Sequence, residues 1–220
     1  MPDSEIYNKI LNLPLFLGMN SNDFGQVVSS VKFGFHHFMP GKQIKKEGDA
    51  CDHIIFLVDG AITSITGANN HSYTVSERIN APAMLQPERI FGLTQHYTKS
   101  YISATECHLI SLDKNEVRFL LESFEVFRLN LLNIIATQSQ RQEKAKWREA
   151  SADIEERIMR FLHEHITTAH GEAFFKIKMT TLANEIGHSR LDTSKALHKL
   201  EDRKLIRISR GMITVLSSGI

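Results

Sequence analysis

The 220-residue chain is poor in the features that mark several specialised classes of protein. It has only two cysteines, Cys51 and Cys107, too few for a disulfide framework and consistent with a reducing cytoplasm. No apolar run approaches the roughly 20 residues that a membrane span needs. Residues 1–10 are acidic and polar, where a secretory signal is basic and then apolar. We therefore expect a cytoplasmic protein without a membrane partner.

Catalytic motifs and compositional extremes are missing as well. We find no G-x-S-x-G, Walker-type phosphate loop, H-E-x-x-H or dinucleotide fingerprint, which argues against an enzyme. There is no low-complexity segment and no internal repeat. A hydrophobic content of 42%, a charged content of 23% and a formal net charge of +1 are ordinary for a globular chain of one or two domains.

The most informative stretch covers residues 179–206, MTTLANEIGHSRLDTSKALHKLEDRKLI. It predicts two helices joined by a tight turn at Gly187, because glycine tolerates positive φ. We expect Thr180 and Thr181 to cap the first helix, and Ser189 to begin the second in a capping box. The expected buried positions are Leu182, Ala183, Ile186, Ala196, Leu197 and Leu200, with Arg190, Asp192, Ser194, Lys195 and Lys199 outward.

This pattern is typical of a helix-turn-helix, whose second helix enters the DNA major groove. The alternative is a helical hairpin that never touches DNA. Charge favours the first interpretation, because residues 174–220 hold nine Lys or Arg against four Asp or Glu. That local excess of positive charge suits a surface that meets phosphates.

The chain up to about residue 113 predicts a helical lead followed by strands. The lead covers Ser4–Leu17 and Asp23–Ser30. Short apolar or alternating runs predict strands at 32–38, 43–46, 53–58, 61–66, 73–78, 101–104 and 108–112. Asp59-Gly60, between two of these runs, is a strong hairpin signal. Closely spaced short strands indicate an antiparallel β-sandwich or β-roll.

Residues 125–150 contain neither Gly nor Pro and predict about 39 Å of continuous helix. Two apolar stripes run along this helix. They consist of Phe127, Leu131 and Ile134 in one case, and of Leu129, Leu132, Ala136 and Ser139 in the other. One stripe suits the chain's own β-domain and the other suits a second copy of the helix. The alternative is one broad buried face within a monomer.

Beyond this helix, the segment Ser151–Asp153 is the expected hinge, and Asp153 with Glu156 is a capping pair for a further helix. A short strand at 174–178 then precedes the helix pair. The runs 205–209 and 212–216 flank Arg210-Gly211 and predict a hairpin with a basic tip, which is a wing.

The order of β-roll, long helix and winged helix-turn-helix resembles the Crp/Fnr family of transcription regulators over nearly the whole chain. PGKQIKKEGDACDHIIFLVDGAI is similar to the family's β-roll signature, IEERIMRFL resembles the start of its DNA-binding domain, and residues 179–206 resemble its helix-turn-helix. The resemblance implies an α+β fold and a homodimer that places two recognition helices in successive major grooves about 34 Å apart.

The implied domains follow the chain in order. They are a cyclic-nucleotide-binding-like antiparallel β-roll sensor (double-stranded β-helix or jelly roll) at 1–124, a long dimerisation helix and hinge at 125–152, and a winged helix-turn-helix at 153–220.

The resemblance also assigns DNA-binding roles. Arg190 holds the place of a base-reading Arg, which can bond guanine O6 and N7 together and contributes about 1–3 kcal/mol of discrimination. Leu191 stands where the family often has a cytosine-reading Glu, so it contacts a thymine methyl or simply packs. Phosphate contacts are expected from Ser189, Lys195, Lys199 and Arg210. Thr180, Asp192 and Ser194 complete the set; RNA polymerase is a further candidate partner.

The segment FGLTQHYTKSYISA matches the phosphate-binding cassette of the family's cyclic-AMP members. The implied effector pocket consists of Phe91, Gly92, Lys99, Ser100, Gln142 and Glu143. However, Leu93 replaces the Glu that holds the ribose hydroxyls, and Lys99 replaces the phosphate Arg without its bidentate fork. A carboxylate at Glu143 suits an anionic purine poorly. The segment argues against cyclic AMP and leaves three readings open: an unidentified small-molecule effector, another anion at Lys99, or a pocket without a ligand.

Cofactors are not indicated by the sequence. Two cysteines cannot supply the four thiolates of the family's iron–sulphur members. Haem needs only one His, but His36 and His37 point to opposite faces of a predicted strand and carry no haem signature. Cys51 and His53 offer two ligands, too few for a metal site. We expect a sequence-specific DNA-binding regulator; the alternative is a nucleotide-binding sensor module whose helix-turn-helix serves protein contacts.

Overall fold

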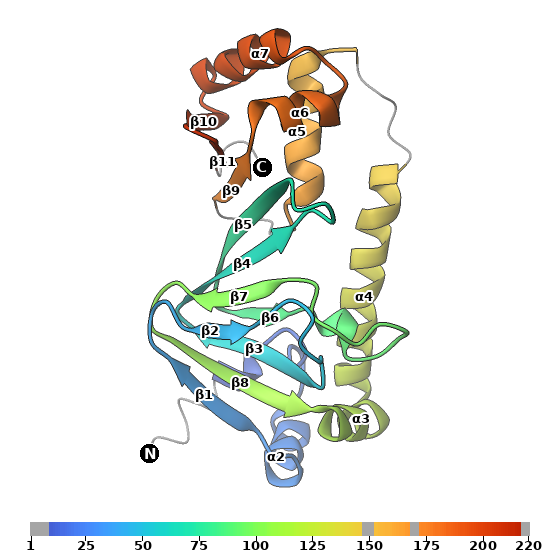
Figure 1. The fold of residues 1–220 in the computed structure, drawn as a ribbon. Helices are drawn as coiled ribbons and strands as arrows, with labels where there is room; N and C mark the ends of the chain where they lie inside the picture. The colour runs from blue at the N-terminus through green and yellow to red at the C-terminus, as the bar shows by residue number, and fades with distance from the viewer. Residues whose placement is uncertain (1–8, 147–151, 168–171, 217–220) are drawn as a thin grey trace. The chain divides into compact units, whose positions relative to one another are not determined.

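The computed structural model describes residues 9–146, 152–167 and 172–216 (Figure 1). The chain forms two compact units. The first, here called the N-terminal unit, comprises residues 1–62 and 80–144, and the second, the C-terminal unit, comprises 63–79 and 145–220. None of the helices among the described residues is both long and apolar enough to cross a membrane.

Antiparallel strands build the N-terminal unit, as the sequence predicts. A four-stranded sheet has the order β1-β8-β3-β6, and β2 pairs with β7. The strands are β1 (Gly34–Phe38), β2 (Gln43–Lys45), β3 (His53–Asp59), β6 (Ala83–Leu85), β7 (Ser100–Ser103) and β8 (Cys107–Asp113). Every strand predicted from the sequence lies within two residues of its expected bounds, whereas β6 was not predicted.

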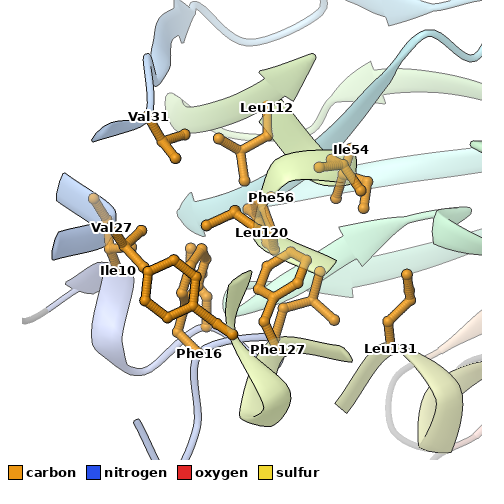
Figure 2. Close-up of a cluster of buried hydrophobic side chains, with 14 of the residues drawn as sticks. Ile10, Phe16, Val27, Val31, Ile54, Phe56, Leu112, Leu120, Phe127 and Leu131 are labelled. Atoms are coloured by element: carbon orange, nitrogen blue, oxygen red, sulfur yellow. The ribbon is translucent and has the colours of Figure 1, made fainter. Parts of the chain in front are cut away.

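Helices cover one face of the four-stranded sheet (Figure 1). They are α2 (Ser21–Ser30), α3 (Lys114–Ser123) and the first half of α4 (Glu125–Lys146). Their shared core is rich in phenylalanine (Figure 2). The Phe16 ring lies 6.0 Å from that of Phe56 on β3 and 5.3 Å from that of Phe127 on α4. Such aromatic pairs contribute about 0.5–1.5 kcal/mol each beyond the area that they bury.

The two apolar stripes of α4 have different environments. Phe127 and Leu131 are buried in the core of the N-terminal unit, and Ile134 packs against it. By contrast, Leu129 and Leu132 are 48% and 56% exposed. The alternative of a single broad buried face is therefore wrong for the described part of this helix. Residues 147–150, to which the helix was predicted to extend, lie outside the described residues.

The predicted hairpin at Asp59-Gly60 is wrong. β3 pairs with β6 and β8, whereas β4 (Ala61–Gly67) belongs to the other sheet, so the chain leaves one sheet and enters the next at this point. Gly60 has φ +85°, and a Cβ there would lie 2.2 Å from the carbonyl oxygen of Glu106. Glycine is thus required because two backbone segments approach closely at a corner between the sheets. In sequence, such a corner looks the same as a two-residue hairpin turn.

The C-terminal unit contains the helix-turn-helix and its wing. Its elements are α5 (Ile154–His165), β9 (Ala173–Ile177), α6 (Met179–Ile186), α7 (Arg190–Asp202), β10 (Ile206–Ser209) and β11 (Met212–Val215). Asp153 caps α5 as predicted, since its carboxylate accepts a hydrogen bond from the amide of Glu155. The predicted caps Thr180 and Thr181 are wrong, because Lys178 occupies the N-cap position of α6 and makes no side-chain cap bond.

A hairpin from the middle of the chain completes the sheet of this unit. β5 (Tyr73–Asn80) pairs antiparallel with β9, from Tyr73 opposite Ile177 to Glu77 opposite Ala173. The hydroxyl of Tyr73 is hydrogen-bonded to Nε2 of His165 at 2.8 Å. The buried carboxylate of Glu77 accepts a 2.7 Å bond from the amide of Thr167. The predicted domain boundaries follow chain order, so they place residues 63–79 with the β-roll, whereas the structure groups these residues with the C-terminal unit.

Two further predictions are affected by the limits of the described residues. In the helical lead predicted at Ser4–Leu17, residues 4–8 lie outside them, residues 9–11 are helical and residues 12–18 are mainly turns. In the predicted hinge, Ser151 lies outside them and Asp153 is the cap of α5. Helix α3 was not predicted; Asp113 caps it by accepting bonds from the amides of Asn115 and Glu116 at 2.7 and 2.9 Å.

Candidate nucleic-acid interface

A tight turn joins α6 to α7. Gly187 ends α6 with φ +71°, and the amide of His188 bonds back to the carbonyl of Ala183 at 3.0 Å. A Cβ at Gly187 would meet only the Arg157 guanidinium, at 3.7 Å. The backbone conformation and not crowding therefore requires glycine here, as the sequence predicts.

The start of α7 is held by the predicted capping box. Ser189 Oγ accepts a 3.1 Å bond from the amide of Asp192 and donates a 2.6 Å bond to its carboxylate. A carboxylate in the first turn also favours the positive end of the helix dipole. Both side chains were predicted to meet DNA, and the structure shows them engaged with one another at the helix start.

One face of α7 is buried and the other is exposed. Thr193, Ala196, Leu197 and Leu200 are buried, which adds Thr193 to the predicted stripe. The hydroxyl of Thr193 donates to the carbonyl of Ser189 at 2.8 Å, so its polar atom is satisfied. The opposite face exposes Arg190, Leu191, Asp192, Lys195 and Lys199, with Ser194 partly buried.

The exposed leucine at the start of α7 resolves one alternative. Leu191 is 65% exposed, so it does not pack inside the unit. Arg190 and Lys195 make no hydrogen bond or ion pair with any described residue, and their charges are available to a ligand. These three side chains belong to the first two turns of the helix, the part of a recognition helix that contacts base edges.

The second half of α7 is tied to α5. Lys199 Nζ and Arg203 Nη1 each lie 3.1 Å from the carboxylate of Glu155, which is mostly buried. Lys199, predicted to contact phosphate, therefore already has a partner within the unit. Sequence reasoning missed Glu155 because the pairing joins residues 44 positions or more apart, and periodicity carries no signal for that.

The wing is fixed by a further carboxylate, that of Glu201, which is among the residues of the helix-turn-helix resemblance. Glu201 accepts a 2.7 Å hydrogen bond from the amide of Ile208 on β10, which joins the wing to α7. Gly211 has φ +73° and allows the sharp turn between β10 and β11. Arg210 at the tip and Thr180 in the first turn of α6 are both exposed, as a DNA-facing role requires.

Several residues of the predicted effector pocket are engaged with other groups of the chain. Lys99 is half-buried and has a partner within the chain, and Ser100 Oγ accepts a 3.0 Å bond from the amide of Glu47. The Lys114 ammonium lies 5.2 Å from the ring centre of Phe91, next to Gly92. Glu143 is exposed, and the side chain of Gln142 lies outside the described residues.

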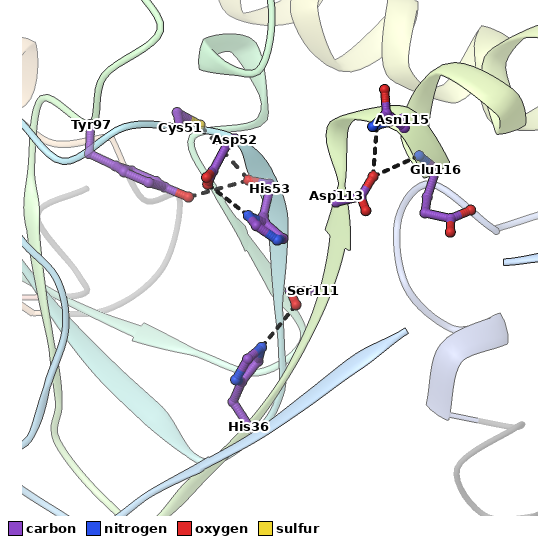
Figure 3. A network of polar contacts seen from close by, with 9 residues as sticks. All are labelled: His36, Cys51, Asp52, His53, Tyr97, Ser111, Asp113, Asn115 and Glu116. Carbon is purple, nitrogen blue, oxygen red and sulfur yellow. Dashed lines mark hydrogen bonds and ion pairs between the residues drawn. The ribbon is translucent and has the colours of Figure 1, made fainter. Parts of the chain in front are cut away.

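A separate cavity of about 200 Å³ lies between the four-stranded sheet and β2. Its lining is His36, Phe38, Ile44, Lys45, His53, Ile55, Leu109 and Ser111. His36 Nε2 and Ser111 Oγ are hydrogen-bonded at 2.9 Å across this lining (Figure 3). None of the residues in the predicted effector pocket lines this cavity.

Beside this cavity, a chain of polar contacts surrounds His53 (Figure 3). Its Nδ1 lies 2.7 Å from the carboxylate of Asp52, and this hydrogen bond lowers the pKa of that carboxyl. The Tyr97 hydroxyl donates to the carbonyl of His53 at 3.4 Å. Burial raises the pKa of both the Tyr97 hydroxyl and the Cys51 thiol. The Tyr97 hydroxyl and the Cys51 thiol are therefore neutral at physiological pH, which suits a structural role.

Two family models match the chain. A cyclic nucleotide-binding domain matches residues 35–124, and a Crp-like helix-turn-helix domain matches residues 156–218. The antiparallel roll and the winged helix-turn-helix with its exposed basic face together define a transcription regulator, a class that is not enzymatic. With these two domains in this order, the chain belongs to the Crp/Fnr family.

Known proteins are similar at low identity. The potassium channel GORK of Arabidopsis thaliana is 26% identical over 147 residues, which are 62% of this chain and 16% of the channel. The potassium channel KOR1 of Oryza sativa subsp. japonica is 28% identical over 139 residues, 60% of this chain and 15% of the channel. The chain thus spans about a sixth of the length of these curated relatives.

Among solved structures, the catabolite activator protein of Thermus thermophilus is similar to this chain with a TM-score of 0.51 and 18% identity. The match covers 93% of this chain and 94% of that one. It supports the fold and its order of elements.

Proposed function

We propose that this regulator binds duplex DNA sequence-specifically as a homodimer, with α7 in the major groove. The observation that carries the proposal is the first half of α7. Its inner face is buried, while Arg190, Leu191 and Lys195 are exposed and have no partner among the described residues. Two cations without a partner on the exposed face of a second helix, in a segment with an excess of positive charge, suit contacts with phosphates and base edges.

The three exposed side chains have different roles in this proposal. Arg190 reads guanine through O6 and N7, and Leu191 contacts a thymine methyl. Lys195 and Arg210 contact phosphates, which fix the register without reading sequence. Lys199 is a weaker phosphate contact, because it would have to leave Glu155 first.

The exposed stripe of α4 supports the dimer. Leu129, Leu132 and Ile135 are exposed large apolar residues on a helix whose other face is already packed. In a twofold dimer, the apolar stripe of one α4 helix packs against the same stripe of the second copy, which is an isologous contact. Two recognition helices are then available for half-sites about 34 Å apart.

The β-roll, in our proposal, receives a signal from an effector that is not cyclic AMP. Leu93 is fully exposed where the cyclic-AMP members need a carboxylate, and Lys99 already has a partner. We expect the protein to act in the cytoplasm, where DNA and, for an activator, RNA polymerase are available.

The test is selection from a randomised duplex pool, followed by fluorescence anisotropy at several fixed salt concentrations. We expect Arg190→Ala to relax base preference at one position per half-site, at a cost of about 1–3 kcal/mol. Lys195→Ala should weaken all sequences alike and reduce the salt slope by about one. The matched control is Arg118→Ala, which removes an exposed cation from α3.

Two outcomes would contradict the proposal. If no sequence is enriched in any ligand condition, α7 does not read DNA. If Arg190→Ala and Lys195→Ala behave identically, the division between base and phosphate contacts is wrong. Heat from binding cyclic nucleotides or nucleotide alarmones, without DNA selection, would favour the nucleotide-binding sensor module instead.

A further inference from the structure

Three side chains with metal-binding chemistry meet on one face of the β1–β8 pair. His37 on β1 is directly opposite His108 on β8, and Glu106 precedes His108 by two residues. Glu106 lies just before the start of β8, and its carboxylate reaches the exposed imidazole of His37, the cross-strand partner of His108. His36, by contrast, points to the opposite face, where it bonds to Ser111.

The donor atoms of these three residues are already close. One ligand atom from each of them lies within 4.8 Å of the others. His37 Nε2 is 2.8 Å from Glu106 Oε1. In a tetrahedral shell with bonds of about 2.0–2.1 Å, neighbouring ligand atoms are about 3.4 Å apart. The cluster therefore needs movements of about an ångström to enclose an ion.

The rings must also turn. The imidazoles of His37 and His108 are stacked, with centroids 4.8 Å apart and planes 21° from parallel. Nitrogen lone pairs lie in the ring plane, so a shared ion requires rotation about the side-chain bonds. The side chains of His37 and Glu106 are 48% and 59% exposed, which leaves room for that rotation.

The backbone that carries the cluster is held firmly. The β1–β8 ladder is regular from Gly34 opposite Ser111 to Phe38 opposite Cys107, and the Cys107 side chain is fully buried. On the other side, the close approach of Gly60 fixes the carbonyl of Glu106. A site carried by paired strands is positioned more accurately than one on loops, so only the side chains have to move to enclose an ion.

We propose that His37, Glu106 and His108 bind one divalent transition-metal ion, for which Zn²⁺ is the probe. Two imidazoles and one carboxylate are a ligand set for Zn²⁺ and its neighbours, whereas Mg²⁺ and Ca²⁺ need oxygen ligands. Three protein ligands leave a position for solvent or a further ligand. The sequence does not predict the site, because residues 37 and 106 become neighbours only through strand pairing.

The bound ion would link the edge strand β1 to its neighbour β8. Among the described strands, β1 is the outer one of its sheet and pairs only with β8. A ligand that binds the folded state stabilises it by mass action. Zn²⁺ should therefore raise the thermal midpoint of the full-length protein and slow hydrogen exchange in β1.

The first experiment is isothermal titration of the full-length, tag-free protein with ZnCl₂. We expect one ion per chain and no comparable heat from MgCl₂ or CaCl₂. His37→Gln, Glu106→Gln and His108→Gln should each lower the affinity at least about 10-fold. The matched control His36→Gln changes the adjacent histidine on the same strand and should leave the affinity within about twofold.

The second measurement reports the coordination environment of the bound ion. Co²⁺ bound to two imidazoles and a carboxylate absorbs visible light more strongly than hexaaqua Co²⁺ does. EDTA should remove the ion and abolish this additional absorption. Circular dichroism in EDTA checks that each variant melts like the unaltered chain, so that a lost site is distinguished from lost folding. Affinity that survives in the His37→Gln, His108→Gln double variant, or falls equally in His36→Gln, would overturn the proposal.

Discussion

Replacing Gly60 by alanine tests the corner at which the chain passes from one sheet to the other. The substitution adds one Cβ at a residue with φ +85°. That atom would lie 2.2 Å from the Glu106 carbonyl oxygen and 2.9 Å from Cα of Cys107. Both neighbours are backbone atoms of a paired strand, so a rotamer change cannot relieve the contact.

Two terms make up the expected cost. A left-handed backbone conformation costs a residue with a Cβ about 1–2 kcal/mol. Overpacking against atoms that cannot yield adds about 1–3 kcal/mol. Gly60→Ala should therefore destabilise the N-terminal unit by about 2–5 kcal/mol, a large part of the 5–15 kcal/mol that typically separates folded from unfolded states.

Gly48→Ala is the matched control. Gly48 has a similar φ of +90°, but a Cβ there would meet no atom within 4 Å. It should show the conformational cost of about 1–2 kcal/mol alone. Hydrogen-exchange mass spectrometry can follow peptides from β3 and β8, with peptides from α7 as an internal reference. If Gly60→Ala and Gly48→Ala accelerate exchange in β8 equally, the corner is not as crowded as described.

Three further predictions concern other parts of the chain. Leu132→Glu should raise the dimer dissociation constant at least about 10-fold in analytical ultracentrifugation, because it places a charge in the proposed helix contact; Leu93→Glu, at a fully exposed leucine outside that helix, should not. Asp113→Ala removes the cap of α3 and should lower the free energy of unfolding by about 1 kcal/mol in urea titrations. Burial raises the pKa values of Cys51 and Cys107, so the reactive thiolate is scarcer than in a free cysteine, and native alkylation by iodoacetamide near pH 8 should be far slower than alkylation in urea. Rapid native alkylation would contradict that burial.

The local residue pattern was sufficient to predict a segment's structure wherever that structure depends on the segment's own residues. The capping box at Ser189, the turn at Gly187 and the bounds of most strands follow from side-chain hydrogen bonding, positive φ and alternation. The Asp59-Gly60 pair shows where this fails. A hairpin and a sheet-to-sheet corner need the same residue, and only the pairing of β3 with β8 distinguishes them.

The candidate interface was predictable in part for the same reason. Exposure of Arg190 and Lys195 follows from helical periodicity, because the buried stripe fixes the opposite face, whereas the sequence left open whether Leu191 packs. The partner of Lys199 does not follow, since Glu155 reaches it from a separate helix. Likewise, nothing local indicates that β5 pairs with β9 in the sheet of the C-terminal unit, because the residue pattern of a strand does not specify which strand lies beside it.

The crowded corner at Gly60 and the proposed metal site both involve Glu106, so one variant can test both. Gly60 touches the backbone of Glu106, and Glu106 carries the carboxylate of the site. If Gly60→Ala is accommodated by a shift of residue 106, the carboxylate moves with its backbone while the two imidazoles stay on their ladder. Zn²⁺ affinity should then fall in Gly60→Ala and persist in Gly48→Ala at temperatures where both variants are folded. An unchanged affinity in a destabilised Gly60→Ala would mean that the Glu106 side chain can compensate for the shift, and that the two imidazoles dominate binding.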